Sequence, residues 1–179
     1  MKQRILTIFF LFTTTICFAQ KHFKFMGIPI DGNVNAFCEK LKNKGFTKDV
    51  GDVENAYCFV GKFYDEDANL QVDYDPANRV VYSVTVYIVK DGSLLTVYPI
   101  QRDILKAVED KYKYEKKTID QQLYQYDYYI YEDYDFVGLI QTFIVDSQTV
   151  PTTKLAMLSL TYLDIENYLN YESRKRKDI

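Results

Sequence analysis

The sequence predicts an α+β domain in which two tandem helix-plus-three-strand units form one antiparallel sheet with helices on one face. The first observation is an order that occurs twice: a segment with helical periodicity, then three runs of alternating apolar and polar side chains. The second is that the halves, about 25–91 and 95–164, overlay at a shift of 67 residues, which carries Phe37 onto Ile104 and Leu41 onto Val108. We therefore expect a single domain made of two similar halves.

Residues 1–19 predict a cleaved signal peptide. Two basic residues precede a mostly apolar run that ends at Phe18, and this run is shorter than the roughly 20 residues that span a bilayer. Cys17 and Ala19 place small residues at the −3 and −1 positions of a cut after Ala19. We expect the mature chain, residues 20–179, to be exported to the periplasm or beyond and to contain no membrane span.

The helix of the first half is predicted at 33–46. Its apolar side chains follow the spacing i, i+3, i+4, i+7 and are Val34, Phe37, Cys38 and Leu41. Asp31 or Asn33 can cap its start. Gly45 can take the left-handed conformation at its end, with Phe46 folding back on the last turn. Three strand-like runs follow, at 57–63, 70–74 and 79–89.

The second half repeats this order. Its helix is expected from about Pro99, because proline is favoured at the first helical position. Its strands are expected at 122–131, 136–145 and 154–163. The run 83–85 matches 159–161 at a shift of 76, and a longer hairpin in the second half explains the change from 67. Asp164 can cap a short last helix, after which the basic run 174–177 is expected to be a solvated tail.

Cys38 and Cys58 are the two cysteines that remain after removal of the signal peptide. An even pair in an oxidising compartment predicts a disulfide. The alternative is that both are thiols that behave as small hydrophobic side chains.

Three stretches carry a resemblance to a known fold: the run 25–32, the helix end at 44–46, and the strand 59–63. They resemble small exported bacterial proteins whose plan is similar to the β-lactamase-inhibitor-protein-like fold, with two helix-plus-strand units in one curved sheet. The SmpA/OmlA-type outer-membrane assembly lipoproteins resemble one such unit. The resemblance implies an open sheet face that binds another protein, cysteines that tie helix to strand, as Cys38 and Cys58 would, and no catalytic residue. The second half lacks cysteines, and the chain lacks a lipid-attachment cysteine, which are departures.

The composition argues against several kinds of chemistry. With 22 basic and 25 acidic residues, the chain lacks the basic excess that phosphate binding needs, so nucleic acid is not an expected partner. The single histidine, His22, lies near the start of the mature chain, where fraying is common, so neither a His-based triad nor a His-ligated zinc is expected. The run 65–69 begins like a calcium-binding loop, but Leu70 and Pro76 stand where Gly and Glu are needed. We expect no catalytic residue, metal site or cofactor.

Tyrosine is the unusual feature, with 17 Tyr and no Trp. Tyrosine is enriched in protein interfaces because it gives rigid, amphipathic contact area, although aromatic side chains also pack simply across strands. Helices that each precede three strands would cover one sheet face and leave the other for water or a partner. The residues assigned to that open face are Thr85, Tyr87, Tyr129 and Tyr131.

The sequence therefore predicts an exported, non-enzymatic protein-binding module, inhibitor-like in its use of an open sheet face. The expected partner is a protein of the periplasm or cell envelope. One alternative is a structural or assembly accessory of the envelope. A less favoured one is a hydrolase that uses a pair of carboxylates, since the 25 acidic residues offer many such pairs.

Overall fold

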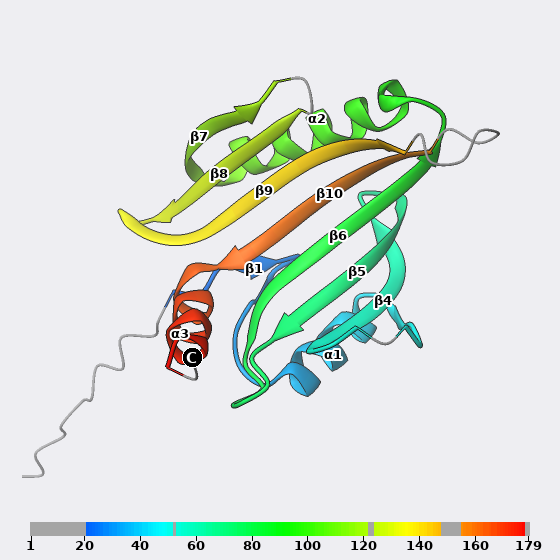
Figure 1. The fold of residues 1–179 in the computed structure, drawn as a ribbon. Helices are drawn as coiled ribbons and strands as arrows, with labels where there is room; N and C mark the ends of the chain where they lie inside the picture. Colours follow the sequence, from blue (N-terminus) through cyan, green and yellow to red (C-terminus); the bar gives the residue numbers. More distant parts are fainter. Residues whose placement is uncertain (1–20, 52, 122–123, 148–154, 178–179) are drawn as a thin grey trace, which may run out of the picture.

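In the part of the chain that the structure describes, the main element of the fold is one antiparallel sheet of eight strands, accompanied by three helices and a small two-stranded sheet (Figure 1). The computed structural model describes residues 21–51, 53–121, 124–147 and 155–177. The predicted signal peptide, 1–19, lies outside the described residues. The α+β class is confirmed. In the described part of the chain, no helix is long and apolar enough to cross a membrane.

The large sheet has the spatial order β3-β4-β5-β6-β10-β9-β8-β7, which puts β6 and β10 at its centre. Along the chain the elements are β1 (Lys24–Phe25), β2 (Ile28–Pro29), α1 (Val34–Asn43), β3 (Thr47–Lys48), β4 (Ala56–Phe63), β5 (Glu66–Tyr74), β6 (Val81–Asp91), α2 (Leu94–Lys111), β7 (Lys113–Asp120), β8 (Gln125–Glu132), β9 (Asp135–Ser147), β10 (Leu155–Asp164) and α3 (Ile165–Lys175). The first part of the chain supplies the strands on one side of the centre, and the second part supplies those on the other.

The two central strands pair antiparallel with Thr85 opposite Thr161. The hydroxyl oxygens of these two residues are 3.0 Å apart. Because side chains alternate along a strand, this register places Val86 and its neighbour Leu160 on the other face, where both are fully buried. The centre of the sheet therefore has one apolar face and one polar face.

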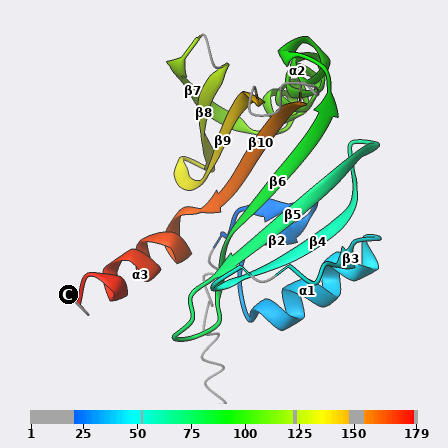
Figure 2. The same ribbon diagram turned by 45° about the vertical axis from the view of Figure 1, so that its right-hand side comes forward.

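The core lies between the apolar sheet face and the helices α1 and α2. One row of that face runs across four strands through Phe59, Leu70, Val86 and Leu160, which are all buried. The buried side chains of α1 are Val34, Phe37, Cys38 and Leu41, and those of α2 are Val97, Gln101, Ile104, Leu105 and Val108. Figure 2 shows both helices on one side of the sheet, while α3 leaves from the end of β10.

The N-terminal hairpin, β1 and β2, belongs to the same core. The ring of Phe25 lies 5.6 Å from that of Phe63 and 5.2 Å from that of Tyr162. Phe23 lies over Gly138, where an added Cβ would come within 2.4 Å of the Phe23 ring. Only glycine allows the ring to pack this closely against β9.

Local signals in the first half behave as expected. Asn33, one of the two proposed caps, accepts a hydrogen bond from the backbone N–H of Asn35 at 2.9 Å. Gly45 has a φ of +94°, and the N–H of Phe46 donates to the carbonyl of Leu41 at 3.2 Å. Phe46 is buried, so the end of α1 is fixed by an apolar contact as well as by the backbone.

Within the large sheet, each half has one described strand more than predicted, and the small sheet β1-β2 was not predicted either. The edge strand β7 was missed because it has no apolar alternation and nearly all of its residues are exposed. A Lys-rich edge strand of this kind discourages pairing with other chains. The short β3 adds a strand at the opposite edge.

The start of α2 also differs from the prediction. The helix begins at Leu94, capped by Ser93, so Pro99 lies inside it. The Ser93 side chain accepts from the N–H of Leu95 at 3.4 Å, and the Thr96 hydroxyl donates to the Ser93 carbonyl at 2.7 Å. The missing N–H of Pro99 would have bonded to the carbonyl of Leu95. Leu95 is 76% exposed, so water can take that place.

The predicted disulfide between Cys38 and Cys58 is wrong, because both cysteines are free. Cys38 is on the buried side of α1, on the core face of the sheet. Cys58 pairs with Gln71 and is out of phase with the buried Phe59, so it points to the opposite face. The sheet therefore separates the two sulfur atoms.

We expect the purified protein to keep both thiols free under oxidising conditions. Burial raises the pKa of the Cys38 thiol to about 11 and also raises the pKa of Cys58. Because Cys58 is the more exposed of the two, iodoacetamide added to the native protein at pH 8 should modify Cys58 before Cys38. Intact mass spectrometry should give the same mass with and without reductant. A species about 2 Da lighter before reduction, the loss of two hydrogens, would contradict the geometry.

Candidate functional site

The candidate site is the sheet face opposite α1 and α2, over the five strands β5, β6, β10, β9 and β8; α3 packs against β6, β9 and β10, with Tyr171 stacked on Tyr82. We call this sheet face the uncovered face. Its residues follow from the pairing register and the alternation of side chains. They are Asp67, Asn69, Gln71, Asp73, Ser83, Thr85, Tyr87, Val89, Asp91, Leu155, Met157, Ser159, Thr161, Leu163, Phe136, Leu139, Gln141, Phe143, Val145, Asp127, Tyr129 and Tyr131.

All four residues assigned to the open face from the sequence lie on the uncovered face. Thr85 is buried at the centre of the sheet, whereas the three tyrosines are partly exposed. Tyr129 and Tyr131 are neighbours on β8, and the ring of each is 5.7 Å from that of Phe136. Tyr87 on β6 is three strand spacings away from them, about 14 Å. The structure therefore separates the four residues into two groups.

A polar row crosses the middle of the uncovered face. Gln71, Thr85, Thr161 and Gln141 lie directly opposite one another on four adjacent strands. The next residue in the row is Asp127 on β8, which accepts a hydrogen bond from Gln141 Nε2 at 3.3 Å. The row thus has amide groups on either side of two hydroxyls, followed by the carboxylate of Asp127, and it continues on β7 with Lys117 directly opposite Asp127.

On the uncovered face, the five strands carry four carboxylates, Asp67, Asp73, Asp91 and Asp127. Basic side chains stand at the two edges: Lys62 of β4 pairs with Asp67, and Lys117 of β7 lies directly opposite Asp127. Asp73 accepts hydrogen bonds from Ser83 Oγ at 2.5 Å and from Gln71 Nε2 at 2.7 Å. Asp127 is only 8% exposed. Within the described residues, neither Asp73 nor Asp127 has its carboxylate within 4.0 Å of a Lys, Arg or His nitrogen. Hydrogen bonds hold both side chains in place, and Lys117 is the basic residue next to Asp127 across the β7–β8 pair.

Aromatic and apolar side chains flank the polar row. On one side, Tyr87 and Phe143 both lie opposite the buried Ser159. Beyond them Met157 lies between Val89 and Val145, which are 44% and 39% exposed. Burial raises the pKa of the Tyr87 phenol, and the negative charge of Asp73 raises it further.

Sequence reasoning missed most of these flanking residues and the carboxylates of the face. The alternation along 79–89 had been recognised, and it already placed Val89 on the same face as Tyr87. The rows across β9 and β10 could not be assigned, because they require the register between strands that are distant in sequence.

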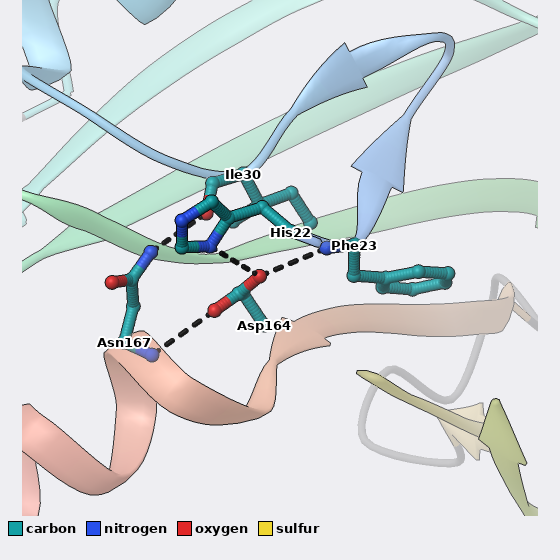
Figure 3. Close-up of polar contacts among 5 residues, drawn as sticks. All are labelled: His22, Phe23, Ile30, Asp164 and Asn167. Atoms are coloured by element: carbon teal, nitrogen blue, oxygen red, sulfur yellow. Dashed lines mark hydrogen bonds and ion pairs between the residues drawn. The ribbon is translucent and has the colours of Figure 1, made fainter. Parts of the chain in front are cut away.

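His22 forms a second polar cluster, shown in Figure 3, and the expectation that it frays was wrong. Its Nδ1 lies 3.1 Å from Asp164 Oδ2, which also accepts the N–H of Phe23 at 2.9 Å. The other oxygen of Asp164 accepts the N–H of Asn167 at 3.0 Å and so caps α3. The Asn167 side chain in turn donates to the carbonyl of Ile30 at 2.9 Å.

This cluster joins the N-terminal segment to α3. A carboxylate beside an imidazole also orients the histidine in catalytic triads, but here both oxygens of Asp164 bind backbone N–H groups. Burial raises the pKa of Asp164, while the hydrogen bonds from Asn167 and Phe23 act in the opposite direction. We therefore assign the cluster a structural role.

The other end of α3 is fixed by Arg174. Its side chain forms an ion pair with the buried Asp75, with Nε 2.7 Å from Oδ2. Arg174 was expected in a solvated tail, so that part of the prediction was wrong. Lys175 also belongs to α3, and only Arg176 and Lys177 of the basic run follow the helix.

In the ranges that the structure describes, no group of three or more His, Cys, Asp or Glu side chains could hold a metal ion. The chain matches no protein-family model, no curated protein and no solved structure. The resemblance to the β-lactamase-inhibitor-protein-like fold stays a prediction. A functional assignment rests on the uncovered face itself.

We expect Asp164→Ala to destabilise the protein by about 2–4 kcal/mol. The change removes a helix cap, worth about 1 kcal/mol, and leaves buried donors without an acceptor, at about 1–3 kcal/mol. Urea unfolding followed by circular dichroism measures the effect. Asp103→Ala is the control, because Asp103 is an exposed acid on α2 paired with Arg102, and its removal should change stability by less than about 0.5 kcal/mol. Equal effects of the two changes would refute the assignment.

We expect Tyr87→Ala to cost about 1 kcal/mol of stability and Tyr128→Ala about 3–5 kcal/mol. Tyr87 is partly exposed on the uncovered face, whereas Tyr128 is fully buried on the core face and donates its hydroxyl to Glu109 Oε1 at 3.0 Å. The same urea experiment compares the two variants. If Tyr87→Ala proves as costly as Tyr128→Ala, the assignment of faces is incorrect.

Proposed function

We propose that the chain is an exported, non-enzymatic protein-binding module that engages its partner with the uncovered face. The observation that carries the proposal is the group of partly exposed aromatic side chains around a fixed polar row. Exposed amphipathic patches of this kind often mark contact sites, and tyrosine is enriched among the residues that contribute most to binding.

The rigidity of the face supports this proposal. The central strands β6 and β10 are held by pairing on both sides and by a buried core beneath them. Side chains such as Thr85 and Asp73 are already fixed by hydrogen bonds within the face. A surface that is ordered before binding loses less conformational entropy when a partner docks.

The dimensions of the face also fit a protein partner. Five strands at about 4.8 Å spacing give a width of roughly 19 Å, and the strands are about 30 Å long. The resulting area of several hundred Å² is comparable with the roughly 800 Å² that each partner contributes to a standard interface.

The positions of Asp73 and Asp127, the two acids beside the polar row, favour binding over hydrolysis. Asp73 on β5 and Asp127 on β8 are four strand spacings apart, or about 19 Å. Carboxylate pairs in glycosidases are separated by about 5–9.5 Å. These two acids are therefore too far apart to act as an acid–base pair on one bond.

We also infer that the two halves derive from one unit by duplication. A shift of 76 residues carries Thr85 onto Thr161. These two residues lie directly opposite each other in the sheet, as they would if a pseudo-two-fold axis passed between β6 and β10. The same axis would relate Gln71 to Gln141, the next residues outward in the polar row. A sheet built in this way has a continuous uncovered face to which both halves contribute.

Photocrosslinking tests the proposed function. We expect p-benzoylphenylalanine in place of Tyr87 or Tyr129 to form a covalent adduct with a partner protein in cells that export the chain. Tyr98, on α2 and 37% exposed, provides the matched control position on the helical side, where no adduct should form. The adduct from position 87 should decrease when Tyr129 and Tyr131 are replaced by Ala. Adducts from position 98 alone, or from no position, would refute the proposal.

A further inference from the structure

We propose that a cleft between α2 and the outer strands β7 and β8 binds a small organic anion that carries a flat, apolar ring, such as an aromatic carboxylate. The cleft has a volume of about 430 Å³, within the range of about 300–1,000 Å³ that is typical of small-molecule sites. It lies on the helical side of the sheet. The inference therefore goes beyond the proposed function and does not depend on it.

The cleft exists because α2 covers only the centre of the sheet. The helix packs against β6, β9 and β10, whereas β8 and β7 extend the sheet beyond it. The α2 side chains that line the cleft recur every three or four residues and include Tyr98, Arg102, Leu105 and Glu109. The strands contribute Lys116, Tyr126 and Tyr128. The two walls are a helix and a pair of strands whose register is fixed by backbone pairing.

Aromatic and aliphatic side chains give the cleft its apolar surface. The ring of Tyr98 is 37% exposed and lies 4.8 Å from that of Tyr124. Leu105 is a buried residue of the α2 wall, and Tyr126 is half-buried on the wall opposite. A flat ring in the cleft can pack against these tyrosines in the offset or edge-on arrangements that aromatic pairs prefer.

Lys116 places a cation over this apolar surface. Its Nζ lies 4.4 Å from the ring centroid of Tyr126 and 5.2 Å from that of Tyr128. The ammonium group is thus held by aromatic rings. Its one ion pair among the described residues is long, with 3.9 Å between Nζ and Oε1 of Glu109, and Glu109 already accepts the Tyr128 hydroxyl at 3.0 Å. Because an ammonium group has three N–H donors, Lys116 can donate to an incoming anion.

Two further basic residues, Arg102 and Lys106, line the same cleft. Arg102 donates to Asp103 from Nε at 3.0 Å and from Nη2 at 2.9 Å. In the part of the chain that the structure describes, no carboxylate lies within 4.0 Å of the Lys106 ammonium.

The sign of the ligand's charge follows from this lining. The cleft has three basic side chains against the two acids Glu109 and Asp110, although the chain as a whole has a formal net charge of −3. A local excess of positive charge in a cleft attracts anions. An anionic group can therefore pair with the Lys116 ammonium while an attached ring packs against Tyr126.

A titration with 2-naphthoate tests the inference on the purified protein. The controls are 2-naphthylmethanol, which has the same ring without the charge, and acetate, which has the charge without the ring. We expect 2-naphthoate to bind about ten-fold more tightly than either control and to shift the ¹H–¹⁵N NMR signals of α2, β7 and β8. Equal affinity for 2-naphthoate and either control, no saturable binding below about 5 mM, or shifts confined to other elements would overturn the inference.

A pair of matched lysine variants locates the charge. Lys116→Gln removes the cation from the cleft and should weaken binding of 2-naphthoate about five-fold. Lys111→Gln is the control, because Lys111 also lies over a tyrosine, 4.6 Å from the ring centroid of Tyr112, but does not line the cleft. It should leave the affinity unchanged. If both variants weaken binding equally, only the net charge of the protein matters and the inference fails.

Glu109→Gln should act in the opposite direction. The substitution removes the acid that competes for Lys116 and keeps an oxygen that can accept the Tyr128 hydroxyl. We expect 2-naphthoate to bind about two-fold more tightly, because a negative charge beside the anion is lost. Weaker or unchanged binding would contradict the placement of the anion at Lys116 and, with it, the inference. Circular dichroism verifies that each variant is folded.

Discussion

The pairing of β6 with β10 is the constraint on which the rest of the structure depends. These strands come from different halves of the chain, and their register sets the position of every other strand in the large sheet. The register that buries Val86 and Leu160 also places Thr85 and Thr161 on the opposite side. A slip of one residue would exchange the two faces of one strand relative to its neighbour. The core and the uncovered face are therefore fixed by the same pairing.

The end of β10 also fixes the first and the last described segments of the chain in place. Asp164 is the last residue of the strand, the cap of α3 and the acceptor for the N–H of Phe23. The hairpin that starts there brings Phe25 into the core between the two halves. At the other end of α3, the ion pair between Arg174 and Asp75 fixes the helix to the turn between β5 and β6.

The sequence predicted those elements whose pattern reflects contact with the core. The helix stripe around Phe37 and the alternation in β6 were identified for this reason, whereas β7 was missed because it has almost no buried side chain. The contact between His22 and Asp164 joins residues 142 positions apart, and no local pattern indicates it. The start of α2 was misplaced because Pro99 was given more weight than the cap at Ser93.

The disulfide is a different kind of error, because the sequence already contained the signal against it. Cys38 was assigned to the apolar stripe of a helix, and Cys58 stands between Tyr57 and Phe59, which were assigned to one face of a strand. These two assignments together place the sulfur atoms on opposite sides of the sheet. The even cysteine count and the compartment were given more weight than this alternation. Residue orientation is therefore stronger evidence than residue count when a disulfide is considered.

The electrostatics of the uncovered face follow from the same separation of faces. Lys48 and Lys116 lie over tyrosine rings on the helical side, and Lys113 does so at the edge strand. On the uncovered face the basic residues lie at the two edges instead, with Lys62 of β4 paired to Asp67 and Lys117 of β7 opposite Asp127. The amide of Gln71 and the hydroxyl of Ser83 orient Asp73, and the amide of Gln141 orients Asp127, so these acids are ordered before any partner docks. Charged groups fixed in this way set the orientation of a partner more than its affinity, while the adjoining aromatic rings supply contact area once the partner has docked.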